Sequence, residues 1–260
     1  MIVSSLTVFV SGCVTDQKVA QAKLEQQAVL GLNWVQQSGE YGALAYQAFN
    51  AARRAFDNAK VPAGRKKAVI VDLDETMIDN SANAAWRVKQ GVPYTKPTWA
   101  RWMADEQAKA IPGAVAFARY VNSHGGRMFY ITNRDDTSYE ATLNNLKKLG
   151  FPGLSRETVV LRKDVSNKQA RFDHVKSLGY DVVVYAGDNL NDFGSAFYGR
   201  NNRERRLMVA AHQAKFGIQF IILPNPNYGD WITGMATDYY KKSPQQQLEI
   251  NREAMRAWKG

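Results

Sequence analysis

Two carboxylates one residue apart, Asp72 and Asp74, follow directly on a short apolar run and are the first candidates for chemistry. The run, residues 68–71, consists of β-favouring and small residues, so it predicts a buried parallel strand that ends at Asp72. Open α/β sheets bind ligands at the carboxyl ends of their strands. Two buried like charges are costly unless a cation or a proton compensates them. The pair therefore suits phosphoryl transfer, with one Asp as nucleophile, the other as acid, and a hard metal ion between carboxylate and phosphate.

Further polar residues follow in a regular order along the chain. A second strand-like run, residues 127–132, ends in a hydroxyl, and a third, residues 182–187, is followed by two acidic residues. A lysine lies between these runs. In chain order the candidates are an acidic pair, a hydroxyl, a lysine and a second acidic pair: Asp72, Asp74, Thr132, Lys168, Asp188 and Asp192.

This order resembles the haloacid dehalogenase superfamily of phosphotransferases, whose four motifs run DxDx(T/V), Ser/Thr, Lys and GDxxxD. Within it, the segments DLDETMIDNS, YITNR, AGDNLNDF, LPNPNYGDW and PGAVAFARYVNSHGG resemble the class C acid phosphatases, which are bacterial surface lipoproteins. Within this family, we expect the chain to be of the type that acts on nucleoside monophosphates. The resemblance runs from about residue 43 to residue 258 and implies a Mg²⁺-dependent phosphomonoester hydrolase.

The resemblance also implies roles for the acidic residues. Asp72 would form an aspartyl-phosphate, and Asp74 would protonate the leaving group and then activate water. Asp72 and Asp188 would ligate Mg²⁺ through carboxylate oxygens and Asp74 through its backbone carbonyl. Asp192 would lie behind the metal and orient its waters or the lysine.

The hydroxyl and the lysine would bind the phosphoryl group. Thr132 would donate to a phosphoryl oxygen, together with backbone N–H groups at the following turn. Asn133 and Arg134 complete this segment as predicted substrate-binding residues. Lys168 would neutralise the charge on the transferring group. Lys163 is the alternative lysine, and Lys168 is preferred because it matches the family's motif position.

Two aromatic residues bear on the choice of substrate. Trp99 and Tyr228 match family positions that enclose the base or pyridine ring of a nucleotide, nicotinamide mononucleotide included. Stacking on a base contributes ~1–3 kcal/mol, which favours nucleotides over simple phosphates without separating the bases sharply. The alternative is that Trp99 belongs to the core of a small subdomain and that Tyr228 is a turn aromatic covering the core edge.

Composition narrows the partners. The formal net charge of +10 would attract phosphorylated substrates or anionic surfaces, or would serve solubility alone. The chain contains no run of Lys and Arg long enough to indicate nucleic-acid binding. The three histidines lie in predicted helices or at their ends, and no RHGxRxP-type motif is present, so phosphohistidine chemistry is not expected.

The beginning of the chain resembles a bacterial lipoprotein signal. Residues 1–12 contain an apolar stretch too short to span a bilayer, and Cys13, the one cysteine, closes a lipobox-like sequence. We expect a signal peptide, truncated because it has no basic start, and a diacylated Cys13. Val14 after the cysteine suits the outer membrane of a bacterial cell envelope, on its periplasmic or surface side. The alternative is a buried cysteine of no consequence.

The remaining elements predict an α/β fold, a haloacid dehalogenase-like (Rossmann-like) parallel sheet with a smaller α-helical cap. Strands are expected near 67–72, 127–132, 158–162, 182–187 and 218–223, and helices near 113–123, 137–149, 167–178 and 203–214. The predicted parts are a lipid-anchored tether (13–40), an N-terminal helical segment (41–66), the catalytic core (67–231) with a helical insertion (77–111), and a C-terminal helical segment (232–260). The two helical segments would pack together as an α-rich layer, which could form a homodimer interface.

Two other functions remain open at this stage. One is a non-specific phosphomonoesterase for which nucleotides are incidental. The other is a surface binding lipoprotein, an adhesin or haem carrier, with secondary catalysis; the intact acidic residues argue against it.

Overall fold

The computed structural model describes the chain from residue 8 onward and its side chains from residue 16 onward. Most of the predicted signal peptide and the side chain of Cys13 therefore lie outside the described residues. From residue 8 to residue 260, none of the helices combines the length and the apolar character that crossing a bilayer requires.

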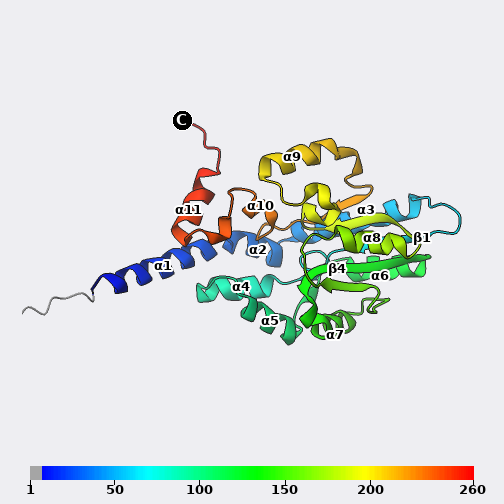
Figure 1. The fold of residues 1–260 in the computed structure, drawn as a ribbon, viewed down its shortest axis with the longest axis horizontal. Coiled ribbons are helices and arrows are strands. Elements are labelled where there is room, and N and C mark those ends of the chain that lie inside the picture. The colour runs from blue at the N-terminus through cyan, green and yellow to red at the C-terminus, as the bar shows by residue number, and fades with distance from the viewer. Residues whose placement is uncertain (1–7) are drawn as a thin grey trace, which may run out of the picture.

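A five-stranded parallel sheet forms the centre of the molecule, with strand order β5-β4-β1-β6-β7 (Figure 1). The strands are β1 (Lys66–Val71), β4 (Gly126–Asp135), β5 (Val159–Arg162), β6 (Tyr180–Gly187) and β7 (Phe220–Ile222). All five predicted strands are confirmed. Because β4 and β6 flank β1 on opposite sides, the chain reverses its direction across the sheet at β1, where a ligand crevice is expected.

The sheet is buried on both faces. Alternate residues of β1 enter different cores: Val69 and Val71 pack on one side, Ala68 and Ile70 on the other. The first face is covered by α3 (Gly39–Asn58), α6 (Ala114–Ser123) and α7 (Tyr139–Leu149). The second face is covered by α8 (Gln169–Ser177), α9 (Asn202–Ala211) and short 3-10 turns.

The helix predicted to start an α subdomain, α3, belongs instead to the sheet. Its buried residues Phe49, Ala52 and Phe56 lie in the same core as β1 and α6. The apolar face was correctly expected, but periodicity alone does not say which surface a helix covers. The prediction that residues 41–58 and 232–260 pack together as an α-rich layer is therefore wrong.

The insertion between β1 and β4 is helical, as predicted. It consists of β2 (Ile78–Asp79), α4 (Ser81–Gln90), α5 (Lys96–Asp105) and β3 (Lys109–Ala110). The antiparallel pair β2–β3 closes its base, so both ends of the insertion leave the core at one point. We call the segment from residue 78 to residue 110 the cap.

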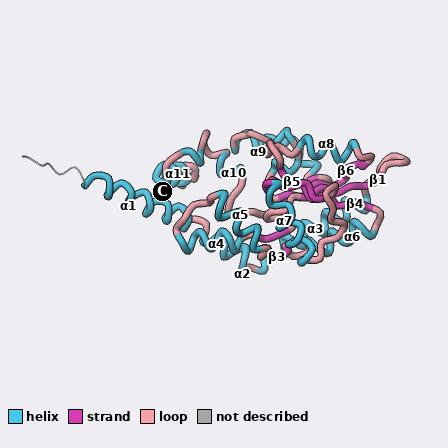
Figure 2. Tube along the Cα trace, turned by 60° about the horizontal axis from the view of Figure 1, so that its bottom comes forward, coloured by secondary structure: helices cyan, strands magenta, loops and turns pink. Residues whose placement is uncertain are grey.

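The segment predicted as a tether is folded in its described part. It forms α1 (Val8–Gln26) and α2 (Val29–Gln37). Leu32 of α2 is buried against Val88 of the cap helix α4. The C-terminal helix α11 (Pro244–Glu253) packs along α1 rather than on α3, and both lie at the end of the molecule opposite the sheet (Figure 2). A short helix, α10 (Asp230–Thr233), precedes it.

The remaining regular elements are five 3-10 turns, which connect the larger helices and strands. They are η1 (Asp136–Ser138), η2 (Leu190–Phe193), η3 (Ser195–Phe197), η4 (Gln213–Lys215) and η5 (Tyr239–Lys241).

Candidate active site

The loop after β1 places the first acidic pair. The Asp72 N–H donates to the Ala186 carbonyl at 3.0 Å, which extends the pairing of β1 with β6 by one residue. Beyond it, the N–H groups of Met77 and Ile78 both donate to the Leu73 carbonyl, at 2.8 and 2.9 Å. This tight loop holds Asp72 and Asp74 at the edge of the sheet where strands β1 and β6 end.

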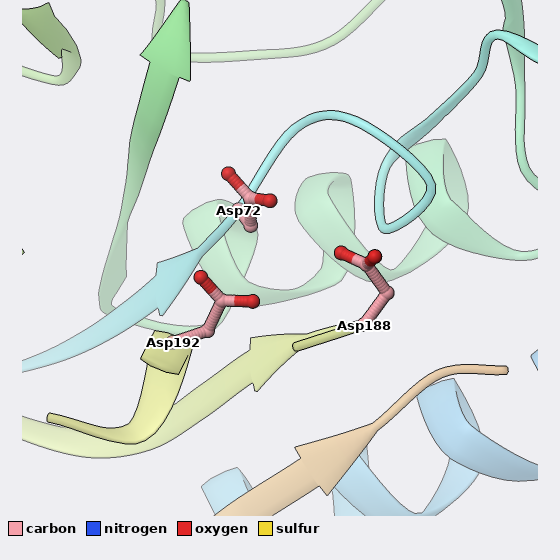
Figure 3. A group of neighbouring side chains, drawn as sticks. All are labelled: Asp72, Asp188 and Asp192. Carbon is pink, nitrogen blue, oxygen red and sulfur yellow. The ribbon is translucent and has the colours of Figure 1, made fainter. Parts of the chain in front are cut away.

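Three carboxylates meet at this edge. Asp72 follows β1, Asp188 follows β6, and Asp192 lies on the 3-10 turn η2. One oxygen from each lies within 4.8 Å of the others, and Figure 3 shows the three side chains turned toward a shared space. A Cβ on Gly187 would lie 2.2 Å from the Asp192 carboxylate, so the site requires glycine there.

Lys168 compensates part of this negative charge. Its Nζ donates to Asp72 Oδ1 at 2.6 Å and to Asp192 Oδ1 at 2.7 Å, and its side chain is 4% exposed. Burial acts to lower the pKa of Lys168, but the two carboxylates outweigh it and raise that pKa. The alternative lysine, Lys163, is exposed. The structure therefore brings Lys168, as the sequence predicted, to the acidic cluster.

Lys168 alone does not balance the negative charge of these carboxylates. Burial raises the pKa of Asp72 to about 7, against the lowering effect of Lys168 and with further raising by Asp192 and Asp74. Burial, Asp192 and Asp72 likewise raise the pKa of Asp188. Because Asp72, Asp188 and Asp192 offer carboxylate oxygens, the cluster fits a hard divalent cation such as Mg²⁺.

Neighbouring side chains orient Asp188 within this cluster. The Thr76 hydroxyl donates to Asp188 Oδ1 at 3.1 Å, and Asn225 Nδ2 donates to Asp188 Oδ2 at 2.8 Å. These bonds fix the carboxylate without removing all of its lone pairs, as an oriented metal ligand requires. Neither Thr76 nor Asn225 was predicted from the sequence as a site residue.

Asp74 lines the same cleft as the cluster and is held by Arg134. Arg134 Nη2 and Nε donate to Asp74 Oδ1 at 2.8 and 3.0 Å, and Asn80 Nδ2 donates to the same oxygen at 2.8 Å. The guanidinium also donates to Thr142 and Asn80, and its side chain is 1% exposed. These bonds show that Arg134 positions Asp74, and because Arg134 also lines the cleft, its role in substrate binding stays a prediction.

The Thr132 segment is fixed by an arginine that sequence reasoning missed. Arg171 donates to the Thr132 carbonyl and to Asn133 Oδ1, both at 2.6 Å. The Arg134 N–H donates to Thr132 Oγ1 at 3.1 Å, which leaves the hydroxyl hydrogen of Thr132 free to donate. Arg171 lies one turn after Lys168, and that spacing was the available signal for it.

These residues open into one large cleft of about 1350 Å³. Asp72, Asp74, Lys168, Asp188 and Asp192 line it at the sheet edge, so five of the six predicted catalytic and metal residues share one cavity. Thr132, the sixth, is buried and is not among the residues that line the cleft.

Aromatic residues from the cap and from the segment after β7 line the same cleft. Trp99 of the cap and Tyr228, which follows β7, both border it. Tyr94, which was not predicted, also borders it, and its ring centroid lies 6.2 Å from that of Trp99. Other walls come from α1 and the C-terminal segment, which the sequence did not associate with the site.

Comparison with known proteins agrees with this geometry. The family model described as "HAD superfamily, subfamily IIIB (Acid phosphatase)" matches residues 3–231. The chain belongs to this family. As a class C acid phosphatase it is a phosphomonoester hydrolase, and the α/β fold inferred from its motifs is confirmed.

Two solved structures share the fold over nearly the whole chain. The class C acid phosphatase from Bacillus anthracis is 36% identical, with a TM-score of 0.85, covering 91% of this chain and 99% of that one. A second structure of the class C acid phosphatase from Bacillus anthracis, with tungstate bound, is 32% identical, with a TM-score of 0.83 and coverages of 93% and 99%.

Proposed function

We propose that this acid phosphatase hydrolyses nucleoside 5′-monophosphates, nicotinamide mononucleotide included, through an aspartyl-phosphate on Asp72 and with Mg²⁺ bound. The observation that carries the proposal is a single cleft that joins a lysine-paired aspartate to aromatic walls. The carboxylate end suits phosphoryl transfer, and the aromatic end suits a flat ring.

The reaction would proceed in two displacements. A carboxylate oxygen of Asp72 attacks phosphorus, the bond to the ester oxygen breaks, and a proton from Asp74 goes to the departing alkoxide. A water then attacks phosphorus of the aspartyl-phosphate, gives its proton to Asp74, and releases inorganic phosphate and free Asp72. Lys168 stabilises negative charge on the transferring group in both displacements.

Mg²⁺, when bound, would neutralise charge that develops on the phosphoryl oxygens. Asp72 and Asp188 would hold it through their carboxylates and Asp74 through its backbone carbonyl. Both oxygens of Asp192 are already engaged, one by Lys168 and the other by the Asn189 N–H at 3.1 Å. That engagement favours Asp192 as the residue that fixes Lys168 beside the metal rather than as a ligand.

Nucleotide preference rests on the aromatic residues. Trp99 and Tyr228 line the cleft that contains the carboxylates, and Tyr94 lies beside Trp99. A ring held between such walls would gain affinity that a bare sugar phosphate does not have. Tungstate, named with the Bacillus anthracis enzyme, is a tetrahedral oxyanion and agrees with a phosphate subsite here, although it says nothing of the ring.

Phosphate release from a substrate panel at pH 5–6 tests both parts of the proposal. The panel contains nicotinamide mononucleotide, AMP, UMP, ribose 5-phosphate and p-nitrophenyl phosphate, each with Mg²⁺ and with EDTA, and Asp72→Asn is the control. We expect metal-dependent turnover that favours the nucleotides and is absent in the control. If kcat/KM for ribose 5-phosphate equals that for the nucleotides, the enzyme is a non-specific phosphomonoesterase and the nucleotide preference is contradicted. Trapping of phosphate on wild-type protein, found by mass spectrometry at Asp72, tests the intermediate.

Lipid anchoring at Cys13 is a separate part of the proposal and rests on the lipobox-like sequence. We expect the mature chain to begin at a diacylated Cys13 and to fractionate with the outer membrane of the bacterial envelope. Mass spectrometry of the mature N-terminus, with Cys13→Ala as the control, tests it. A mature protein of unmodified mass in the soluble fraction would contradict it.

A further inference from the structure

Asn80 lies where the catalytic loop, the cap and Arg134 meet. Its side chain is buried, at 3% exposure. Its Nδ2 donates to Asp74 Oδ1 at 2.8 Å, and its Oδ1 accepts from Trp102 Nε1 at 2.8 Å and from Arg134 Nη2 at 3.2 Å. The Asn80 N–H donates to Glu75 Oε1 at 2.8 Å. The side-chain amide therefore contacts three residues of the site and its surroundings, and the backbone N–H contacts a fourth.

The hydrogen bonds distinguish the two oxygens of Asp74. Oδ1 accepts from Asn80 Nδ2 and from two nitrogens of Arg134, at 2.8, 3.0 and 2.8 Å. Oδ2 accepts only a longer contact of 3.2 Å from Arg134 Nε. Asn80 Nδ2 and Arg134 Nη2 occupy the two lone pairs of Oδ1, whereas Oδ2 accepts only a share of the Arg134 Nε–H, so Oδ2 is the oxygen left to carry a proton to the leaving group.

The same amide connects Asp74 to the ring-binding wall. Trp102, whose indole N–H ends on Asn80, lies on α5 one turn beyond Trp99, which lines the cleft. The guanidinium carbon of Arg134 lies 5.6 Å from the centroid of the Trp99 ring. The position of α5 and the orientation of the Asp74 carboxyl are thus fixed by one set of contacts.

We propose that Asn80 is a positioning residue that presents Oδ2 of Asp74 to the leaving group and that Trp102 keeps Asn80 in place from the cap. This inference rests on the proposed role of Asp74 as the general acid. Among the described residues, the side-chain hydrogen bonds of Asn80 go to Asp74, Arg134 and Trp102 and not to the expected metal-ligand atoms.

Leaving groups of different basicity separate this role from a merely structural one. The alkoxide of AMP needs a proton as it departs, whereas p-nitrophenolate is a weak base and leaves without one. The constant to compare is kcat/KM, because it reports steps up to formation of the aspartyl-phosphate and excludes its later hydrolysis. A structural defect would lower kcat/KM for both substrates alike.

The first experiment measures kcat/KM for AMP and for p-nitrophenyl phosphate in wild type, Asn80→Ala and Asp74→Asn. For Asn80→Ala we expect a loss of about 10- to 100-fold on AMP, the range for one hydrogen bond to a charged group, and less than about threefold on p-nitrophenyl phosphate. Asp74→Asn should show the same selectivity with a larger loss. Equal losses in Asn80→Ala, with selectivity kept in Asp74→Asn, would overturn the inference alone. No selectivity in Asp74→Asn would overturn the proposed acid.

Trp102→Phe decides the question if Asn80→Ala does not fold, because it removes the N–H donor and keeps most of the ring. We expect kcat/KM for AMP to fall selectively, by about three- to tenfold. The loss is smaller than in Asn80→Ala because Trp102 acts on Asp74 only through Asn80. Trp86→Phe is the matched control, since Trp86 is a half-exposed cap residue outside the cleft and outside this network. Identical behaviour of the two Trp variants would overturn the role of Trp102.

Discussion

The two ends of the cleft are built in different ways. At the sheet edge, Asp72, Asp188 and Lys168 are fixed by strand ends, tight turns and a buried ion pair at 2.6 Å. At the outer end, Trp99 and Tyr94 belong to the cap, and the remaining walls come from helices of the N- and C-terminal segments. The first arrangement is set by short segments and the second by packing between segments far apart. Apart from the contacts of Asn80 with Asp74 and Trp102, which connect the two ends, catalytic power and substrate choice should therefore respond separately to mutation.

The largest effect on turnover is expected from substitution of Lys168, at the catalytic end. Lys168→Met removes the ammonium that neutralises the transferring phosphoryl group, and we expect kcat to fall by about 100- to 1000-fold on every substrate of the panel. Lys163→Met is the matched control, because Lys163 is exposed and nearby in the chain, and its kcat should stay within about twofold of wild type. Steady-state assays with AMP and ribose 5-phosphate measure both. A loss confined to AMP would break the division between the two ends.

The outer end should show the opposite pattern. Trp99→Leu removes one ring face and keeps a bulky apolar side chain, so we expect kcat/KM for nucleotides to fall by about 5- to 150-fold, the range for loss of ~1–3 kcal/mol of stacking. Ribose 5-phosphate, which has no ring to stack, should keep its kcat/KM within about twofold. The same assay on Tyr228→Leu tests the second face. Loss on both kinds of substrate would mean that Trp99 serves the cap rather than the base.

The catalytic end could largely be predicted from the sequence because Asp72 and Asp188 each follow a strand and Thr132 lies near the end of one. A buried strand and the carboxyl end of a parallel sheet are legible in a few adjacent residues, and this placed Asp72, Thr132 and Asp188. The alternation of strands and helices likewise gave all five strands. Local pattern was sufficient there because the parallel sheet itself brings the strand ends together.

What could not be predicted depends on contacts between distant segments. The hydrogen bonds of the Arg134 guanidinium to Asp74 and Asn80 were not predicted, because no local signal places an arginine against one carboxylate rather than another. The amphipathic pattern of α3 showed a buried face without naming the sheet as its partner. Residues 13–40 are polar enough to read as a spacer, but Leu32 and Val35 are buried in the structure.

The buried charge at the catalytic end should affect the thermal stability of the protein as well as its turnover. Burial raises the pKa of Asp72 from an ordinary 3.8 to about 7, and the pKa of Asp188 is raised as well. A raised carboxyl pKa means that folding favours the protonated form. The stabilising contribution is complete below about pH 4 and is lost as the pH rises through about 7. The Tm of metal-free protein should therefore fall over this interval.

Thermal unfolding in EDTA and in Mg²⁺ measures this effect. We expect Mg²⁺ to raise the Tm by several degrees at pH 7 and by much less at pH 4.5, because protonated carboxylates do not bind the cation. Asp188→Asn is the control, and its metal-free Tm should fall less steeply with pH than that of wild type. Parallel curves for the two proteins would show that other groups govern the pH dependence.

The smallest effect is expected where α1 meets the cap. Arg87 Nη1 of α4 donates to Glu25 Oε2 of α1 at 3.0 Å, and the two side chains are only 18% and 11% exposed. Partly buried pairs of this kind contribute about 1 kcal/mol, so Glu25→Gln should lower the Tm by a few degrees. Because Glu25 and Arg87 also border the outer part of the cleft, KM for nucleotides should rise up to about threefold while kcat is unchanged.

A double-mutant cycle with Arg87→Gln shows whether the pair itself is responsible. If the ion pair joins α1 to the cap, the double variant should lose little more than either single variant. Fully additive losses would mean that the two residues act independently and that α1 does not hold the cap. A fall in kcat on p-nitrophenyl phosphate would contradict the division of the cleft into two independent ends. It would mean that residues of the outer walls also affect catalysis at the sheet edge.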